Sequence, residues 1–431
     1  MDDTTFYLET YGCSLNKADS DLIVSRLGGL GAEQTSDIEV ADLIVLNTCG
    51  VKEPTEDRII HRLEELGNQP VPVIVAGCLP RISIDRIQRA IPSFAALLGP
   101  QSLDTLGNVV NRVLKGERGI VHLDSDSESK LRFFEEPPDS VICTIPICEG
   151  CLGSCAYCAV RFARRNVRSY SISEIHNVVE RCVHVGYGEI RLTSQDAGVF
   201  GHDTGETLVG LLRNLDQIDG NHRFRLGMFN PNLVLDTIDD LISVMESEHF
   251  FKFFHVPLQT GSDGLLTAMG RKYTVAEWTE IVSKVRGGIP RATIATDIIV
   301  GFPGETASDF EDTIDLLRRM RPEVVNISKY GDRPGTAASR ANNKVDTLVK
   351  KERSRKLSSI VSDSVTDLNA SWVGWTGEVI ATEAGPRGGI VCRNFAYKPI
   401  ILLEEVTLGS TINVEITSSE RTHLFAQMCR D

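Results

Sequence analysis

Apolar, strand-like runs alternate with amphipathic helical patterns through most of this 431-residue chain. In the N-terminal part, residues 6–11, 42–47 and 71–76 are expected to be strands, with helices at 17–27 and 53–66 between them. This alternation is typical of a parallel sheet flanked by helices. It resumes further along with six more strand candidates, at 141–147, 189–194, 223–228, 253–258, 293–300 and 324–328. Six parallel units predict a barrel or partial barrel, with its chemistry at the C-terminal ends of the strands.

The end of the chain has a different pattern. Short β-rich runs at 376–381, 400–403 and 410–416 are separated by glycine-rich turns, which predicts a small all-β barrel. Residues 124–139 are acidic and polar, and they are interpreted as a linker. The expected fold class is therefore α/β. The expected parts are an open parallel α/β sheet over 1–123, the linker, a partial (βα)6 barrel over 140–370 and the β-barrel over 371–431.

Composition narrows the class of protein. The chain is 42% hydrophobic and 24% charged, which is ordinary for a folded domain. It has no apolar run of the roughly 18 residues that cross a membrane, and its acidic start lacks a signal-peptide pattern, so a cytoplasmic, non-membrane protein is expected. The net charge of −14 argues against general nucleic-acid coating but leaves room for a local basic patch.

The eleven cysteines are the chemically informative residues, and three of them are clustered. Cys151, Cys155 and Cys158 have the spacing C-x3-C-x2-C, directly after the first expected barrel strand. Three thiolates on one loop can hold three irons of a [4Fe-4S] cluster and leave the fourth iron open for S-adenosylmethionine. The alternative adds Cys148, which gives a four-cysteine pattern compatible with structural zinc.

Cys13, Cys49 and Cys78 lie far apart in the sequence, but each falls just beyond an expected strand. The C-terminal ends of parallel strands share one edge of the sheet, which is where open α/β sheets bind ligands. The fold can therefore gather three distant thiols into one site. The alternative is that all three are buried structural thiols, since free cysteine behaves as a small hydrophobic residue.

These motifs carry a family resemblance. The loop over 148–158 resembles that of the radical S-adenosylmethionine superfamily, and the segments 10–16, 47–53 and 77–80 resemble the three cysteine motifs of the methylthiotransferase family. The resemblance continues through 255–262, 269–273, 297–305 and 333–336. The last 60 residues resemble a TRAM domain, an RNA-binding barrel, through 389–391 and 393–399.

The resemblance implies a transferase with two [4Fe-4S] clusters. The cluster on Cys151, Cys155 and Cys158 cleaves S-adenosylmethionine to a 5′-deoxyadenosyl radical. The cluster on Cys13, Cys49 and Cys78 delivers sulfur to the substrate carbon, and a second S-adenosylmethionine supplies the methyl group. Such an enzyme needs a reductant, such as ferredoxin or flavodoxin, and a sulfur source.

Four further segments indicate the substrate that the resemblance implies. Segments 149–155, 192–196, 225–231 and 327–335 are most similar to the archaeal and eukaryotic branch, which converts N6-threonylcarbamoyladenosine beside the tRNA anticodon to its 2-methylthio derivative. Two alternatives are retained. One is a methylthiotransferase that acts on an aspartate of a small-subunit ribosomal protein, and the other is a non-catalytic iron–sulfur or zinc RNA-binding protein.

Further contacts are expected around these motifs. Ser194 and Gln195 follow the second barrel strand, where relatives hold the amino group of the cofactor, although a plain turn is the alternative. Asp297 lies inside an expected strand, and we expect it to pair with a nearby arginine, with a contact to a ribose hydroxyl as the alternative. The candidates for tRNA contacts are Arg161, Arg164, Arg165 and Arg168 after the cysteine loop, and Arg387, Arg393, Tyr397 and Lys398 in the β-barrel. For the first group the alternative is a solvated helix face or a set of ion-pair partners.

Overall fold

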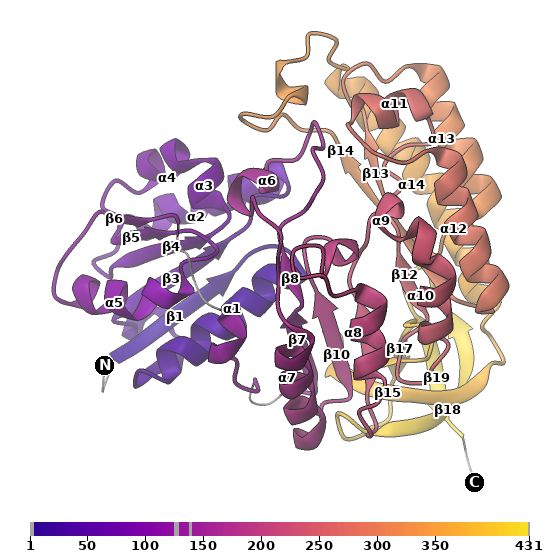
Figure 1. Cartoon of the computed structure of the whole chain (residues 1–431), viewed down its shortest axis with the longest axis horizontal. Helices are drawn as coiled ribbons and strands as arrows, with labels where there is room; N and C mark the ends of the chain where they lie inside the picture. The colour runs from indigo at the N-terminus through magenta and orange to yellow at the C-terminus, as the bar shows by residue number, and fades with distance from the viewer. Residues whose placement is uncertain (1–3, 125–128, 138–139, 430–431) are drawn as a thin grey trace. The chain divides into compact units, whose positions relative to one another are not determined.

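The computed structural model describes residues 4–124, 129–137 and 140–429 (Figure 1). The chain forms two compact units. Unit 1 comprises Met1–Pro137, Glu149–Tyr170 and Gly331–Ser339, and unit 2 comprises Pro138–Cys148, Ser171–Tyr330 and Arg340–Asp431. The units thus exchange segments along the chain, whereas the expected parts follow chain order, and the expected bounds stay a prediction. Among the described residues, none of the helices combines the length and apolar character needed to cross a membrane.

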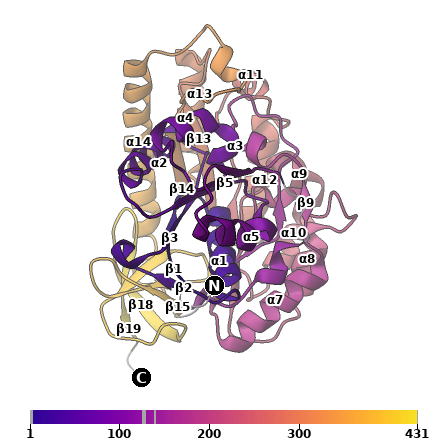
Figure 2. The same ribbon diagram turned by 90° about the vertical axis from the view of Figure 1, so that its left-hand side faces the viewer.

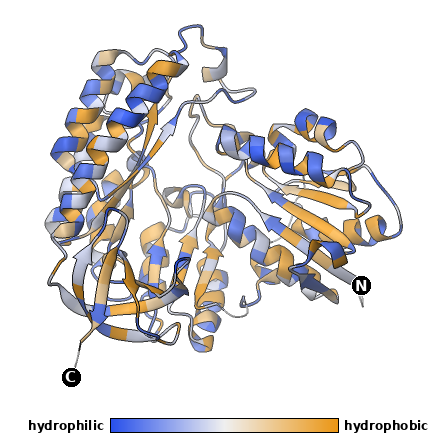
Figure 3. Cartoon of the chain, turned by 180° about the vertical axis from the view of Figure 1, so that it is seen from behind, coloured by the Kyte–Doolittle hydropathy of each residue, from blue (hydrophilic) through white to orange (hydrophobic). Residues whose placement is uncertain are grey.

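Unit 1 is built on a six-stranded parallel sheet with the order β2-β1-β3-β4-β5-β6. Its strands are β1 Thr4–Thr10, β2 Ala32–Thr35, β3 Leu43–Thr48, β4 Val73–Gly77, β5 Ala96–Leu98 and β6 Ile120–His122. Every residue of the central strands β3 and β4 is buried, because helices cover both faces of a parallel sheet. Figure 3 shows these strands as a hydrophobic layer. The expected strands correspond to β1, β3 and β4, and the short strands β2, β5 and β6 were not expected.

The helices of unit 1 pack their apolar faces on this sheet. They are α1 Ser14–Gly28, α2 Glu53–Leu66, α3 Leu79–Ile82, α4 Ile84–Ala90, α5 Leu103–Leu114 and α6 Val160–Ala163, with short 3-10 helices at Ile38–Val40 and Lys130–Phe133. In α2 the helical spacing places Ile59, Leu63 and Leu66 on one fully buried face. Burial of each such side chain contributes about 1.5–3 kcal/mol.

The expected linker at 124–139 is partly ordered. Residues 125–128 and 138–139 lie outside the described residues. Between them, the 3-10 helix Lys130–Phe133 buries Lys130 and Leu131. This stretch is therefore more than a solvated connection, because its lysine belongs to the interior of unit 1.

The larger part of unit 2 is a set of six parallel strands in two three-stranded sheets, with the orders β11-β10-β7 and β12-β13-β14. The strands are β7 Ile142–Pro146, β10 Glu189–Thr193, β11 Arg223–Leu226, β12 Phe253–His255, β13 Thr293–Val300 and β14 Val324–Lys329. A parallel bridge between Phe224 and Phe250 lies between the two sheets. All six strands match expected ones, and the α/β fold class with a partial barrel is confirmed. A separate two-stranded sheet joins β8 Cys148–Glu149 and β9 Arg168–Ser169.

Helices cover the outside of these strands. They are α7 Ile172–Val185, α8 Leu208–Leu215, α9 Pro231–Val234, α10 Ile238–Met245, α11 Asp263–Ala268, α12 Val275–Gly288, α13 Ala307–Met320 and α14 Thr347–Ala370, with 3-10 helices at Ala197–Val199, Leu235–Thr237 and Ala338–Arg340. α7 begins with a capping box that Ser171 and Glu174 form. Such a cap satisfies free backbone N–H groups and stabilises a helix by about 1 kcal/mol.

The end of the chain is a closed five-stranded barrel with the order β15-β16-β17-β19-β18. Its strands are β15 Thr376–Ala384, β16 Ile390–Arg393, β17 Pro399–Leu402, β18 Thr411–Ser419 and β19 Leu424–Met428. The long helix α14 leads into it (Figure 2). Val379, Cys392 and Leu402 are among the fully buried residues of its core. Closure removes exposed strand edges, and the barrel is consistent with the expected TRAM domain.

Candidate functional site

Cys13, Cys49 and Cys78 follow three adjacent strands of the unit 1 sheet. Cys49 directly follows β3, Cys78 directly follows β4, and Cys13 lies just after β1 at the start of α1. The order β1-β3-β4 makes the three strands neighbours, so their C-terminal ends share one edge. Cys49 and Cys78 are each 3% exposed, and Cys13 is exposed. The sheet therefore brings the three cysteine loops together at one edge, with one thiol open to solvent.

Two glycines permit this close approach. Gly12 has a φ of +119°, and a Cβ there would lie 2.5 Å from the Cβ and 2.7 Å from the Sγ of Cys49. Gly77 has a φ of +93°, and its Cβ would lie 2.4 Å from the carbonyl oxygen of Thr48. Any other residue would strain the backbone and push the loops apart. Asn16 joins the loops, since its Nδ2 donates to the carbonyl oxygens of Tyr11 at 3.0 Å and Thr48 at 2.8 Å.

The buried thiols are disposed to remain neutral unless a cation binds them. Burial raises the pKa of Cys78 to about 12, with Arg164 opposing the rise and Cys13 and Cys49 adding to it. Burial also raises the pKa of Cys49, with Cys13 adding to the effect. A bound metal reverses this balance, because coordination deprotonates the thiol.

Arg164 lies in a buried ion network beside Cys78. Its Nη1 donates to Glu149 Oε2 at 2.9 Å, and its Nη2 pairs with Asp19. Lys130 Nζ lies 3.1 Å from Asp19 Oδ1 and 2.5 Å from Glu149 Oε1. Burial alone would lower the pKa of Arg164, but Asp19, Cys78 and Glu149 raise it, so the guanidinium stays charged. The network thus balances two buried cations with two buried carboxylates.

This network corrects one prediction and adds residues that sequence analysis missed. Arg164 was expected to contact RNA phosphates, but it is 1% exposed and its guanidinium is engaged inside unit 1. Asp19 and Lys130 were not identified, because they are distant in sequence from each other and from the cysteine loop. The one available signal was a lone lysine within an acidic stretch.

The second set of cysteines lies on a single loop of unit 1. Cys151, Cys155 and Cys158 are all partly exposed. The backbone N–H of Gly153 donates to Cys151 Sγ at 3.2 Å, and a Cβ on Gly153 would lie 3.2 Å from that sulfur and 3.5 Å from the sulfur of Cys155. Burial raises the pKa of Cys158, and backbone N–H groups at the start of α6 oppose this rise. Backbone donors aimed at sulfur are the contacts that stabilise a bound thiolate.

The segment Gly331–Ser339 contacts both cysteine sites within unit 1. Arg333 Nη2 donates to the carbonyl oxygen of Gly50, directly after Cys49, at 2.9 Å. The backbone N–H of Ala338 donates to the carbonyl oxygen of Ala156, inside the second cysteine loop, at 2.9 Å. One segment therefore holds residues next to both sets of thiols.

A set of three thiolates matches the ligands of a [4Fe-4S] cluster. Over the described ranges, no group of three or more His, Cys, Asp or Glu side chains is arranged to hold a single ion. In a [4Fe-4S] cluster each thiolate binds a different iron, so the sulfurs need not converge on one point. Cys148, the fourth cysteine of the zinc alternative, is fully buried and its Sγ lies 3.6 Å from the carbonyl oxygen of Asp196.

Ser194 and Gln195 follow β10 in unit 2 and carry unused acceptors. Ser194 Oγ and Gln195 Oε1 are shielded from solvent and have no hydrogen-bond partner among the residues that the structure describes. The next residue, Asp196, is fully engaged, because it accepts from the backbone N–H groups of Gly198 and Asn230 at 3.1 Å each. Buried polar atoms normally have partners, so these two orphaned oxygens fit a ligand contact better than a plain turn.

Asp297 on β13 contacts side chains of both neighbouring strands. Its Oδ2 lies 2.8 Å from His255 Nε2 and its Oδ1 accepts from Asn326 Nδ2 at 3.0 Å, and the expected pairing with an arginine stays a prediction. β12, β13 and β14 are hydrogen-bonded neighbours, so side chains from all three strands meet on one face.

The remaining RNA candidates divide by exposure. Arg161 and Arg165 are exposed, and Arg161 lies 5.3 Å from the ring of Phe162. Arg393 is half-buried. Lys398 is 5% exposed and its Nζ donates to Asn369 Oδ1 at 3.1 Å. Lys398 is therefore a structural residue in this fold and a second correction.

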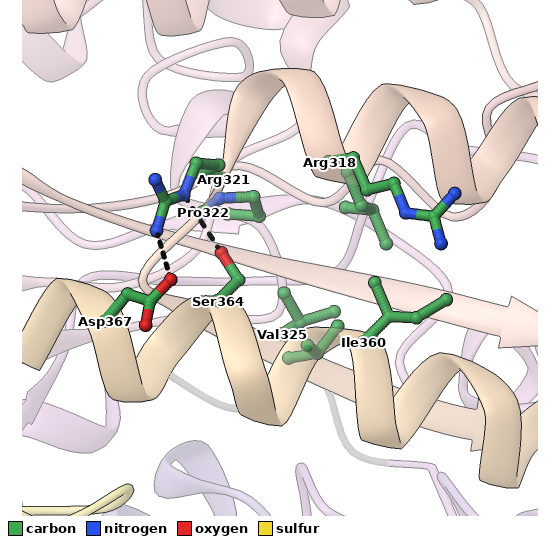
Figure 4. A pocket seen from close by; sticks show the side chains of 9 residues that line it. Arg318, Arg321, Pro322, Val325, Ile360, Ser364 and Asp367 are labelled. Atoms are coloured by element: carbon green, nitrogen blue, oxygen red, sulfur yellow. Dashed lines mark hydrogen bonds and ion pairs between the residues drawn. The ribbon is translucent and has the colours of Figure 1, made fainter.

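Unit 2 has two cavities, of which one is lined by none of the expected site residues and the other by two of them. Figure 4 shows a cavity of about 240 Å³ between α13 and α14, where Arg321 contacts Ser364 and Asp367. None of the expected site residues lines it. A cavity of about 410 Å³ between α14, β14 and the C-terminal barrel is lined in part by Tyr397 and Lys398.

Comparisons with known proteins agree with this arrangement. The Radical SAM superfamily model matches residues 145–317, and the model described as "Uncharacterized protein family UPF0004" matches residues 5–99. The first match implies S-adenosylmethionine and a [4Fe-4S] cluster as cofactors. Among solved structures, the radical S-adenosylmethionine methyltransferase TsrM from Kitasatospora setae matches with a TM-score of 0.60 at 11% identity, covering 79% of this chain and 74% of that one. This likeness shows the fold alone.

Curated relatives are much closer in sequence. A probable threonylcarbamoyladenosine tRNA methylthiotransferase of Pyrococcus abyssi is 39% identical, covering 92% of this chain and 93% of the relative. One from Methanothermobacter thermautotrophicus is 38% identical over 99% of this chain and 100% of the relative. The Homo sapiens threonylcarbamoyladenosine tRNA methylthiotransferase is 30% identical over 99% of this chain and 74% of the relative. With two cysteine triads in unit 1 and near full-length similarity, the chain belongs to the threonylcarbamoyladenosine tRNA methylthiotransferase family of radical S-adenosylmethionine proteins.

Proposed function

We propose that this protein replaces the hydrogen on C2 of N6-threonylcarbamoyladenosine, beside the tRNA anticodon, with a methylthio group. The observation that carries the proposal is the presence of two separate cysteine triads in unit 1, in a chain similar over nearly its whole length to relatives of that name. The substrate is taken from those relatives. The TRAM-like barrel is consistent with an RNA substrate.

The two triads are proposed to hold two [4Fe-4S] clusters. When bound, these groups supply reductive cleavage of S-adenosylmethionine to a 5′-deoxyadenosyl radical and the transfer of sulfur to the substrate carbon. Cys151, Cys155 and Cys158 ligate the first, and the N–H of Gly153 stabilises the thiolate of Cys151.

Cys13, Cys49 and Cys78 ligate the second cluster. Buried Cys49 and Cys78 limit access to it from the sheet side, whereas the exposed position of Cys13 leaves one side open. Arg164 places a permanent positive charge beside Cys78, which favours the thiolate form that ligation requires.

Ser194 and Gln195 are proposed to bind the ammonium group of S-adenosylmethionine. An ammonium offers three N–H donors and no acceptor, so it needs oxygen acceptors around it. Support comes from the two buried, unpartnered oxygens of these side chains.

Contacts with tRNA are proposed for Arg161 and Arg165, which are exposed beside the second cysteine loop, and for Arg393 on the barrel. A low-potential reductant, such as ferredoxin or flavodoxin, and a sulfur source are further proposed partners. We place the reaction in the cytoplasm, because tRNA and reduced iron–sulfur clusters occur together there.

The test is mass spectrometry of tRNA nucleosides from cells with and without the gene. The expected result is loss of 2-methylthio-N6-threonylcarbamoyladenosine and accumulation of its precursor without the methylthio group. Unchanged nucleosides would contradict the substrate assignment and move the search to the ribosomal-protein aspartate. Zinc without iron in anaerobically purified protein would contradict the radical chemistry itself.

A further inference from the structure

Two arginines lie side by side on the inner strands of unit 2, and neither is among the site residues described above. Arg191 on β10 and Arg225 on β11 are direct partners in the parallel register. Their strand neighbours Ile190 and Phe224 are fully buried. Because successive strand residues point to opposite faces, Arg191 and Arg225 share the face away from this apolar layer.

The C-terminal barrel brings a third arginine and an aromatic ring to the same face. The guanidinium of Arg393 lies 4.5 Å from the centre of the Tyr397 ring, and that of Arg225 lies 5.4 Å from the same ring. Arg225 also lies 4.7 Å from the ring of Phe253 on β12. Two guanidinium groups therefore share one aromatic surface within a partly enclosed site.

The carboxylates at this site do not balance the three arginines. Glu189 Oε1 accepts from Arg191 Nε and from the hydroxyl of Tyr397, each at 2.5 Å, so it is already shared. Arg393 has Glu383 at 3.7 Å. Arg225 makes no ion pair with a carboxylate anywhere in the described part of the chain.

The unbalanced charge destabilises the site in the absence of a ligand. Burial lowers the pKa of Arg225, and the nearby charges of Arg191 and Arg393 contribute to this decrease. Arg225 is nevertheless only half-buried, so a ligand can reach it. A desolvated cation between like charges gains most from an anion that accepts its hydrogen bonds. The planar fork of arginine matches a carboxylate, and the flanking rings match a flat group attached to it.

We propose that Arg225, supported by Arg191 and Arg393, binds the carboxylate of the N6-threonylcarbamoyl group of the substrate base. This inference rests on the proposed function. Threonine joined through its nitrogen to a carbamoyl group keeps a free carboxylate, which an unmodified adenosine lacks. Arg191 lies on β10 three residues before Ser194, roughly 10 Å along the strand at about 3.3 Å per residue, so the arginines lie within reach of a substrate group placed near the proposed cofactor contacts. Arg225 is therefore a specificity residue that selects the modified base.

The test is binding of anticodon stem-loop RNAs to the reconstituted holoenzyme, measured by fluorescence anisotropy. Three RNAs are compared: one with the threonylcarbamoyl group, one with its neutral methyl ester and one with plain adenosine. The wild-type protein is expected to bind the carboxylate form about 10- to 100-fold more tightly than the ester, as charged hydrogen bonds of this kind provide. Arg225→Met is expected to bind both forms with the affinity that the wild type shows for the ester.

Arg213→Met is the matched control for the loss of one positive charge. Arg213 lies on α8 in the same unit and pairs with exposed Asp240, so its loss should leave the preference for the carboxylate intact. Arg225→Met with an unchanged preference would overturn the inference alone. Equal weakening of all three RNAs by Arg225→Met would also overturn it, because the guanidinium would then contact a phosphate. A wild-type protein without any preference for the modified base would contradict the proposed substrate as well.

Discussion

The two cysteine triads of unit 1 are assembled in opposite ways. Cys151, Cys155 and Cys158 lie within eight residues on one loop, so chain connectivity alone keeps them together. Cys13, Cys49 and Cys78 are brought together by the order of three parallel strands and by glycines that let their loops touch. The first site depends on local sequence, and the second depends on the fold. The dispersed triad should therefore be more sensitive to changes elsewhere in the sheet.

The buried ion network connects the two sites. Glu149 and Arg164 flank the loop that carries the local triad, whereas Asp19 belongs to α1 beside the dispersed triad. The positive charge of Arg164 also opposes the rise that burial causes in the pKa of Cys78. The local loop is thus anchored to the sheet by charges, and perturbing the network tests how far the two sites are independent.

The largest expected effect separates the chemical roles of the triads. Cys151→Ala should abolish cleavage of S-adenosylmethionine, because the two remaining thiolates do not hold the cluster that cleavage requires. Cys49→Ala should retain cleavage but lose methylthiolation. Both are measured as 5′-deoxyadenosine and modified nucleoside formed by reduced protein, with Cys429→Ala, an exposed cysteine outside both triads, as control. Full product formation by the Cys49 variant would show that the dispersed triad is misassigned.

Removing the charge that connects the sites should have the next largest effect. Arg164→Met leaves two buried carboxylates facing one lysine, which should destabilise unit 1 by about 3–5 kcal/mol. Urea unfolding of the apo-protein and iron content after reconstitution measure this. The adjacent Arg165 is exposed, so Arg165→Met should change the unfolding free energy by less than about 0.5 kcal/mol. Equal stability of the two variants would contradict the role of the network.

The network should also make the free energy of unfolding depend on pH in the acidic range. Although burial opposes it, Lys130 and Arg164 hold the pKa of Glu149 at about 2, below its usual value of 4.5. The folded state therefore binds fewer protons than the unfolded state, so this stabilisation is present above the usual pKa of 4.5 and is lost as the pH falls toward the lower pKa of the folded state. In urea unfolding of apo-proteins, the difference between wild type and Glu149→Gln should shrink over that range. A difference independent of pH would show that Glu149 is not ionised in the folded state.

The smallest expected effects are the losses of stability when a glycine beside each triad is replaced by alanine. Gly12→Ala should destabilise the protein by about 2 kcal/mol and reduce the iron bound, because it combines a positive φ with a close contact to Cys49. Gly116→Ala has a similarly positive φ of +94° but open space around it, so it isolates the backbone strain. Gly153→Ala meets Cys151 Sγ at 3.2 Å without a positive φ, and it should cost under about 1 kcal/mol. Thermal unfolding that ranks Gly153→Ala above Gly12→Ala would contradict the dependence of the dispersed triad on the fold.

Much of the fold was predictable because its signals are periodic. The alternation of apolar runs and helical patterns identified all six inner strands of unit 2 and the central strands of unit 1. The strands β2, β5 and β6 were missed, and each has only three or four residues, too few to show a period. The equally short β12 was identified because the expected strand-like run over 253–258 continues beyond it. The strands β16 and β19 were missed for a similar reason, since they are short and surrounded by turns.

The site residues divide by the range over which their environment is set. The six cysteines were identified because either their spacing or their place after a strand is visible in the chain. The burial of Arg164 and Lys398 could not be identified from the sequence, because each side chain is enclosed by a segment distant in sequence. That segment is α1 for Arg164 and α14 for Lys398. The sequence does not distinguish an arginine that is ion-paired in the interior from an arginine on the surface.

The sequence by itself therefore determined the α/β class, the local cysteine loop and the family, because contiguous residues carry those signals. Only the tertiary structure decided that Asp19, Lys130 and Arg164 form one buried network, and that Arg225 lies unpaired beside Tyr397. The physical reason is that burial and charge balance depend on which distant segments pack together. Spacing along the chain does not contain that information.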